Sequence, residues 1–158
     1  MECAVLTHAL ALIGNEKFGK TFDPNRLLAG ALFHDMNEVL TGDLPTPIKY
    51  YNDDIKGAYK QIEKVSLDKM LSLLDENTAK AYENLFSLNE EETRLLKGAD
   101  KLCAYIKCLQ ELERGNREFF SACRYNEESL RAMKMPEVDY FMENYLPSFT
   151  KNIDEVSL

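Results

Sequence analysis

Histidine is scarce in this sequence, and acidic side chains outnumber basic ones. Its 158 residues include two histidines, no tryptophan, and 19 Lys and Arg against 27 Asp and Glu, so the formal net charge is −8 at pH 7. Nucleic-acid polymers and anionic membranes bind to basic patches. We therefore expect neither as a partner. A small phosphate ligand is not excluded, because a bound cation can reverse the local sign of the charge.

Long apolar runs and cysteine motifs are also absent. No run approaches the roughly 20 apolar residues of a membrane span, and the N-terminus lacks the basic region, apolar run and cleavage site of a secretory signal. The four cysteines, none in a Cys-x-x-Cys pair, are Cys3, Cys103, Cys108 and Cys123. Such cysteines are typical of buried thiols in a reducing compartment. We expect a cytoplasmic protein without a membrane partner.

Helical periodicity dominates what is present. Apolar stripes and capping residues predict helices over residues 2–13, from Asp23-Pro24 to about 34, from 53 or 54 to about 74, and over 75–85, 89–114 and 117–133. An aromatic-rich tail from Pro136 should pack back on these helices or on a second subunit. No segment alternates as a strand does, and the length suits one domain. The sequence thus predicts an all-α, single-domain helical bundle over residues 1–158.

The stretch from Leu32 to Tyr50 is the main candidate site. His34, Asp35, Glu38 and Asp43 follow an apolar run. If residues 27–40 are helical, His34 and Glu38 share a face, and an imidazole nitrogen and a carboxylate oxygen can converge on one cation. The competing interpretation, given about equal weight, is a helix-end histidine held by the neighbouring acid.

The loop around Thr46 favours the interpretation of this stretch as a functional site. Two prolines restrict the backbone on both sides of Thr46. A helix needs no such tail to end, whereas the wall of a pocket needs a loop that keeps its shape.

A second acid stands beside an apolar stripe further along the chain. Asp100 borders the stripe formed by Leu95, Ala99, Leu102, Ile106 and Leu109. An acid in such surroundings needs a partner. That partner is a metal, a donor network, or a salt bridge to Lys97 or Lys101.

These segments resemble a known family. The dipeptide His34-Asp35, residues 38–50 (EVLTGDLPTPIKY) and residues 99–108 (ADKLCAYIKC) are similar to the bacterial HD-domain 5′-deoxynucleotidases of the YfbR type. The likeness extends to residues 8–11, 139–143 and 147–149, and so covers nearly the whole chain. The two-proline loop is far more specific than the His-Asp pair.

The resemblance implies an all-helical HD-type bundle, usually a homodimer, that releases phosphate from deoxynucleoside 5′-monophosphates. It also implies a divalent transition-metal cofactor such as cobalt, manganese or zinc. The roles it implies are metal binding by His34, Asp35 and Asp100, catalysis by Glu38 and Asp43, and substrate binding by Asp43, Thr46 and Lys49.

One departure concerns the first helix. The family's first ligand histidine would fall just before Met1, its substrate-binding arginine and tryptophan lie further upstream, and His8 matches a non-ligand histidine. We therefore expect the first helix to be incomplete. The alternative to an active phosphohydrolase is an inactive or impaired HD-fold protein that binds nucleotide or metal without that histidine.

Overall fold

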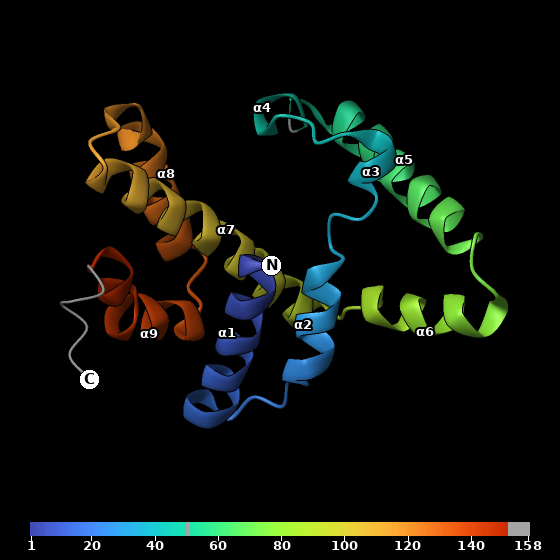
Figure 1. Cartoon of the computed structure of the whole chain (residues 1–158), viewed down its shortest axis with the longest axis horizontal. Coiled ribbons are helices and arrows are strands. Elements are labelled where there is room, and N and C mark those ends of the chain that lie inside the picture. Colours follow the sequence, from blue (N-terminus) through green and yellow to red (C-terminus); the bar gives the residue numbers. More distant parts are fainter. Residues whose placement is uncertain (50, 152–158) are drawn as a thin grey trace. The chain divides into compact units, whose positions relative to one another are not determined.

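Helices make up every regular element of residues 1–49 and 51–151, which the computed structural model describes; the side chains of Thr46 and Pro47 lie outside this description (Figure 1). In chain order the elements are α1 (Glu2–Phe18), α2 (Pro24–Leu32), α3 (Glu38–Thr41), α4 (Thr46–Lys49), α5 (Asp53–Leu71), α6 (Glu76–Phe86), α7 (Glu90–Glu113), the 3-10 helix η1 (Arg117–Phe119), α8 (Phe120–Ala132), α9 (Pro136–Asn144) and the 3-10 helix η2 (Leu146–Thr150). The all-α class is confirmed.

Internal contacts divide the chain into two compact units. The terminal unit contains Met1–Ala31 and the chain from Leu88 onward, and the middle unit contains Leu32–Ser87. The prediction of one domain over residues 1–158 stays a prediction.

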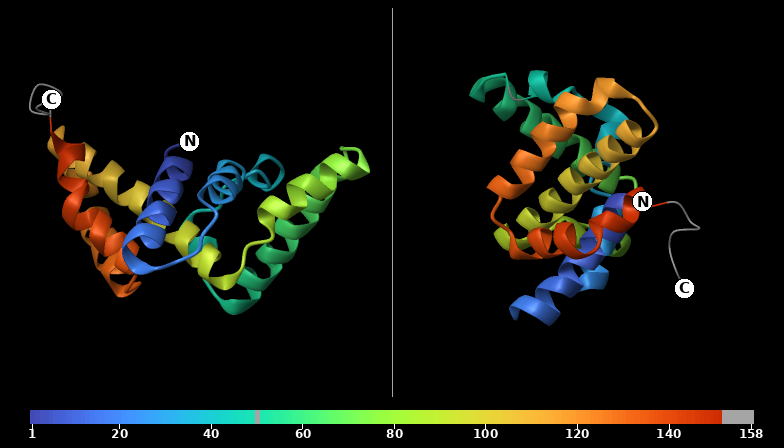
Figure 2. Two further views of the ribbon diagram at one scale, coloured as in Figure 1. Left: turned by 90° about the horizontal axis from the view of Figure 1, so that it is seen from below. Right: turned by 90° about the vertical axis from the view of Figure 1, so that its left-hand side faces the viewer.

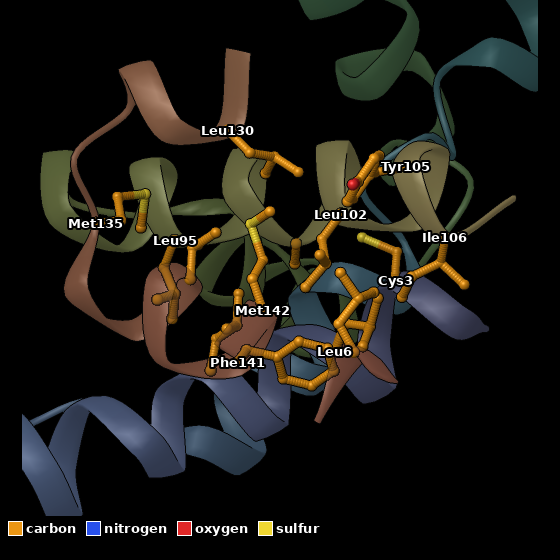
Figure 3. Packing of buried hydrophobic residues seen from close by; sticks show 14 of the residues in the cluster. Cys3, Leu6, Leu95, Leu102, Tyr105, Ile106, Leu130, Met135, Phe141 and Met142 are labelled. Atoms are coloured by element: carbon orange, nitrogen blue, oxygen red, sulfur yellow. The ribbon is translucent and has the colours of Figure 1, made fainter. Parts of the chain in front are cut away.

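The terminal unit is built around α7. Helix α1 packs against it, α8 runs back beside it, and α9 packs against α1 (Figure 2). Figure 3 shows side chains of these helices meeting in one core. The predicted stripe on α7 is confirmed, with no exposed surface on Leu95, Ala99, Leu102 and Ile106. Each buried leucine contributes about 1.5–3 kcal/mol relative to an exposed one. The tail from Pro136 also packs back as predicted, because Phe141 and Leu146 belong to the same core.

The first helix does not end at residue 13, contrary to the predicted range of 2–13. Helix α1 continues to Phe18 and ends at Gly19, whose φ of 65° is the left-handed conformation that glycine adopts easily. A Cβ on Gly14 would lie 2.9 Å from the Phe22 ring and 3.2 Å from the Glu137 side chain. Gly14 is therefore a site of close packing inside the helix and not its terminator.

Local sequence fixes the starts of α2 and α7. The Asp23 carboxylate accepts a hydrogen bond from the Arg26 backbone N–H at 3.0 Å, as an N-cap does. At α7, Asn89 and Glu92 form a reciprocal capping box, and the Glu92 carboxylate also pairs with the Arg26 guanidinium. Both starts agree with the prediction.

The middle unit is less well covered than the sequence suggested. The predicted starts of α5 and α6 are confirmed by the caps Asn52 and Asp75. However, Ile62 and Val65, which belong to the apolar stripe that predicted this helix, are 52% and 65% exposed. Within this unit α5 packs against α3, α4 and α6, which are shorter than α5 and cover only part of its apolar stripe. Tyr59 is the clearest exception, at 5% exposed.

None of the helices in the described part of the chain is long and apolar enough to span a bilayer.

Candidate active site

The backbone around His34 forms turns and not the continuous helix on which the predicted His34–Glu38 spacing depended. Helix α2 ends at Leu32 and α3 begins at Glu38. Between them, Met36 N–H donates to the Phe33 carbonyl at 3.0 Å and Glu38 N–H donates to the Asp35 carbonyl at 2.9 Å. Short polar residues such as Asp and Asn favour such turns over helix. His34 and Glu38 are therefore not stacked one helical turn apart.

The predicted side chains of the middle unit nevertheless gather in one place. The His34 Nε2 atom lies 3.0 Å from the Asp35 Oδ2 atom. Glu38 is half-buried, and burial raises the pKa of its carboxyl, with a further rise from the negative charges of Asp35 and Asp43; Lys49 and His34 oppose the rise. Four other candidate residues of this unit thus act electrostatically on Glu38. The His34–Asp35 contact by itself is also what the helix-end interpretation predicts.

Tyr59 anchors the turn that carries Asp43. Its hydroxyl donates to the Gly42 carbonyl at 3.0 Å and lies 3.5 Å from the Thr41 hydroxyl. Gly42 has a φ of 71°, a conformation that L side chains rarely adopt. This turn leaves the Asp43 side chain exposed to solvent.

Lys49 is held from two sides by α5. Its ammonium donates to the Glu63 carboxylate at 2.7 Å and lies 4.6 Å from the centre of the Tyr59 ring. These contacts restrict an otherwise flexible cation. Thr46, the other predicted substrate contact, begins α4, but its side chain lies outside the described part of the structure.

Asp100 belongs to the terminal unit, where it lies on α7 next to the fully buried Ala99. A carboxylate oxygen of Asp100 lies within 4.8 Å of the Cys3 Sγ atom on α1. The Cys103 thiol hydrogen-bonds with Cys3, and this bond together with burial raises the pKa of Cys103. The four cysteines are free thiols, as predicted.

Sequence reasoning missed the supporting residues. Neither Tyr59 nor Glu63 was among the candidate site residues. Their spacing of four residues on α5 places both on one side of the helix, but nothing local indicates that this side meets Gly42 and Lys49. Cys3 was read only as a buried thiol, because its proximity to Asp100 depends on how α1 packs on α7.

Comparison with known proteins decides the family. The model of the family described as 5′-deoxynucleotidase YfbR-like matches residues 1–149. The chain belongs to this family. The resemblance noted in the sequence is thereby confirmed.

Similar proteins within the 5′-deoxynucleotidases come from several bacteria. One from Erwinia tasmaniensis is 46% identical over an alignment of 160 positions, which covers 99% of this chain and 81% of that protein. One from Vibrio parahaemolyticus is 45% identical, with 99% of this chain and 82% of that protein covered. One from Yersinia pestis is 45% identical, with 100% and 82% covered. Each of these relatives carries the name 5′-deoxynucleotidase.

Proposed function

We propose that this protein is a 5′-deoxynucleotidase, a phosphohydrolase that releases phosphate from deoxynucleoside 5′-monophosphates. Family membership and the shared name of the relatives support the reaction. The assignment of this reaction to particular residues rests on the cluster of candidate side chains in the middle unit. There an imidazole, two carboxylates and an ammonium act on the half-buried Glu38.

The cofactor we propose is a divalent cation held by His34, Asp35 and Asp100. The chemistry of the donors supports this: an imidazole nitrogen 3.0 Å from a carboxylate oxygen is a donor pair that zinc and related metals bind. Asp100 is included because the family's ligands follow the order His, His-Asp, Asp. When bound, such a cation neutralises phosphate oxygens and lowers the pKa of a water to about 7.

Glu38 is the residue that we propose accepts a proton from the attacking water. Ordinary glutamates, with a pKa near 4.3, are weak bases at neutral pH. The raised pKa of Glu38 makes its carboxylate a stronger base than that of an ordinary glutamate. The water oxygen then bonds to phosphorus and the bond from phosphorus to the 5′ oxygen breaks. The 5′ oxygen takes up a proton from solvent and leaves as the deoxynucleoside hydroxyl, and Glu38 returns its proton to solvent.

The remaining candidates are proposed to position the substrate. Lys49, restrained by Glu63 and Tyr59, presents a fixed positive charge for a phosphate oxygen. Asp43, exposed after the Gly42 turn, can accept a hydrogen bond from a sugar hydroxyl. Thr46, which begins α4, is assigned to substrate binding on the resemblance alone.

The test is phosphate release from dAMP by the parent and by Glu38→Gln. We expect a loss of about 10²–10⁴ in kcat with little change in metal content, because the amide cannot accept the proton. Glu76→Gln is the matched control, since Glu76 is an exposed acid of the same unit that pairs with Lys80. Full activity of Glu38→Gln would refute the role. Metal binding without any phosphate release by the parent would favour the impaired binding protein instead.

We also propose a cytoplasmic homodimer. The free thiols support a reducing compartment. An apolar groove of about 400 Å³ on the terminal unit supports a protein partner, because its lining residues Val5 and Leu12 are 59% and 44% exposed.

A further inference from the structure

Cys3 lies beside Asp100, although no step of the proposed reaction uses it. It occupies the first turn of α1, which packs closely on α7, and its Sγ atom lies within 4.8 Å of an Asp100 carboxylate oxygen. Figure 3 shows Cys3 at the edge of the core near Leu102 and Ile106, which follow Asp100 along α7. A soft and a hard metal-binding group are therefore brought together by two packed helices of one unit.

The separation of these atoms is close to what a shared cation requires. A tetrahedral cation with a thiolate at about 2.3 Å and a carboxylate oxygen at about 2.1 Å holds the sulfur and oxygen about 3.6 Å apart. The separation of at most 4.8 Å between the Cys3 sulfur and the Asp100 oxygen exceeds this value by at most about 1.2 Å.

The surroundings of Cys3 suit a thiolate ligand. The sulfur lies at the N-terminus of a 17-residue helix, where the helix dipole favours negative charge. The Cys103 thiol hydrogen-bonds with Cys3 and gives the sulfur the kind of outer partner that orients metal ligands. The Thr7 hydroxyl donates to the Cys3 carbonyl at 2.7 Å and lies 4.0 Å from its sulfur.

We infer that Cys3 supplies a thiolate ligand to the cation that Asp100 binds, an inference that rests on the metal site of the proposed function. On binding, the thiol loses its proton to solvent. A thiolate is a soft ligand that suits zinc, whereas manganese and magnesium favour oxygen ligands. The site would therefore prefer zinc or cobalt over manganese.

The test is titration of the full chain with Co²⁺ in a non-thiol reductant, followed by absorption. We expect a thiolate-to-cobalt charge-transfer band in the near ultraviolet for the parent. Cys3→Ser should lose this band, keep the weaker d–d absorption of bound cobalt, and bind cobalt at least about tenfold more weakly. Cys108→Ser is the matched control, a buried thiol of α7 that should leave the band unchanged.

Other outcomes separate this inference from the proposed function. A band that persists in Cys3→Ser, or a parent that binds cobalt without the band, overturns the thiolate ligand and leaves the phosphohydrolase intact. A parent that binds no cobalt, or whose affinity is unchanged by Asp100→Asn, overturns both. If Cys3→Ser does not fold, zinc X-ray absorption on the parent decides the question: a sulfur at about 2.3 Å supports the inference, and only lighter ligands at about 2.0–2.2 Å refute it.

Discussion

Removing the Arg26 guanidinium should expose how the start of α7 is stabilised. Glu92 is 7% exposed, its Oε2 atom accepts the Asn89 N–H at 3.0 Å, and its other oxygen pairs with Arg26. Burial acts to raise the pKa of Glu92, but the hydrogen bonds from Arg26 and Asn89 outweigh it, so the pKa lies below its ordinary value. Arg26→Ala leaves a buried carboxylate without its main charged partner.

The magnitude follows from the exposure of the pair. Breaking a fully buried ion pair costs about 3–5 kcal/mol. The Arg26 and Glu92 side chains are 23% and 10% exposed, so solvent reduces the cost, and we expect about 2–3 kcal/mol at pH 7. For a chain of this size that is a fall in Tm of about 4–12 °C.

The sign of the pH dependence is the sharper test. In the parent, the folded pKa of Glu92 lies below the unfolded one, so its stabilisation is present above the unfolded pKa and is lost as pH falls through the folded pKa. In Arg26→Ala the effect of burial dominates and raises the pKa. The contribution of Glu92 to the free energy of unfolding then reverses in its pH dependence. It is largest below the unfolded pKa of Glu92 and is lost as pH rises through the folded pKa. The stability difference between parent and variant should therefore shrink toward acid pH.

Urea unfolding at several pH values measures this difference. Arg124→Ala is the control, because Arg124 and Glu128 form an exposed pair on α8 that should contribute at most about 0.5 kcal/mol. Adding Glu92→Gln to Arg26→Ala should recover part of the loss by removing the buried charge. A cost equal to that of the control, or one that does not vary with pH, would refute the reasoning.

Three further predictions concern metal binding, packing and assembly. Asp35→Ala and Asp100→Ala should each lower divalent-metal affinity by more than about 100-fold, because each removes a charged ligand. The circular dichroism of both variants should stay helical. An unchanged affinity by calorimetry in either variant would remove that residue from the ligand set. Gly14→Ala should destabilise the fold by about 1–2 kcal/mol, because the added Cβ would overlap the Phe22 ring. Gly57→Ala on α5 should instead stabilise the fold by up to about 1 kcal/mol, because no atom lies within 4 Å of the added Cβ. Equal thermal shifts in the two variants would contradict the packing of Gly14. Val5→Glu should shift the sedimentation of the protein toward monomer, and a dimer of unchanged strength would place the interface elsewhere.

The sequence by itself determined the features that depend on neighbours along the chain. The start of α7 is an example, because Asn89 and Glu92 are three residues apart and satisfy each other's backbone groups wherever the helix lies. The buried stripe from Leu95 to Ile106 is another, because helical periodicity alone places these residues on one face. Membership of the family also followed from the sequence, because the two-proline loop and the His-Asp pair are short contiguous motifs.

Only the tertiary structure decided what depends on distant partners. Gly14 reads as a helix terminator until Phe22 and Glu137 are seen against it, because close approach is a property of the other chain segment. The exposed side of α5 carries the same apolar stripe as a buried helix, and only the short lengths of its packing partners leave Val65 uncovered. Likewise, the Cys3 sulfur comes within reach of Asp100 through the packing of α1 on α7, an arrangement set by the shape of the shared core and encoded in no local pattern.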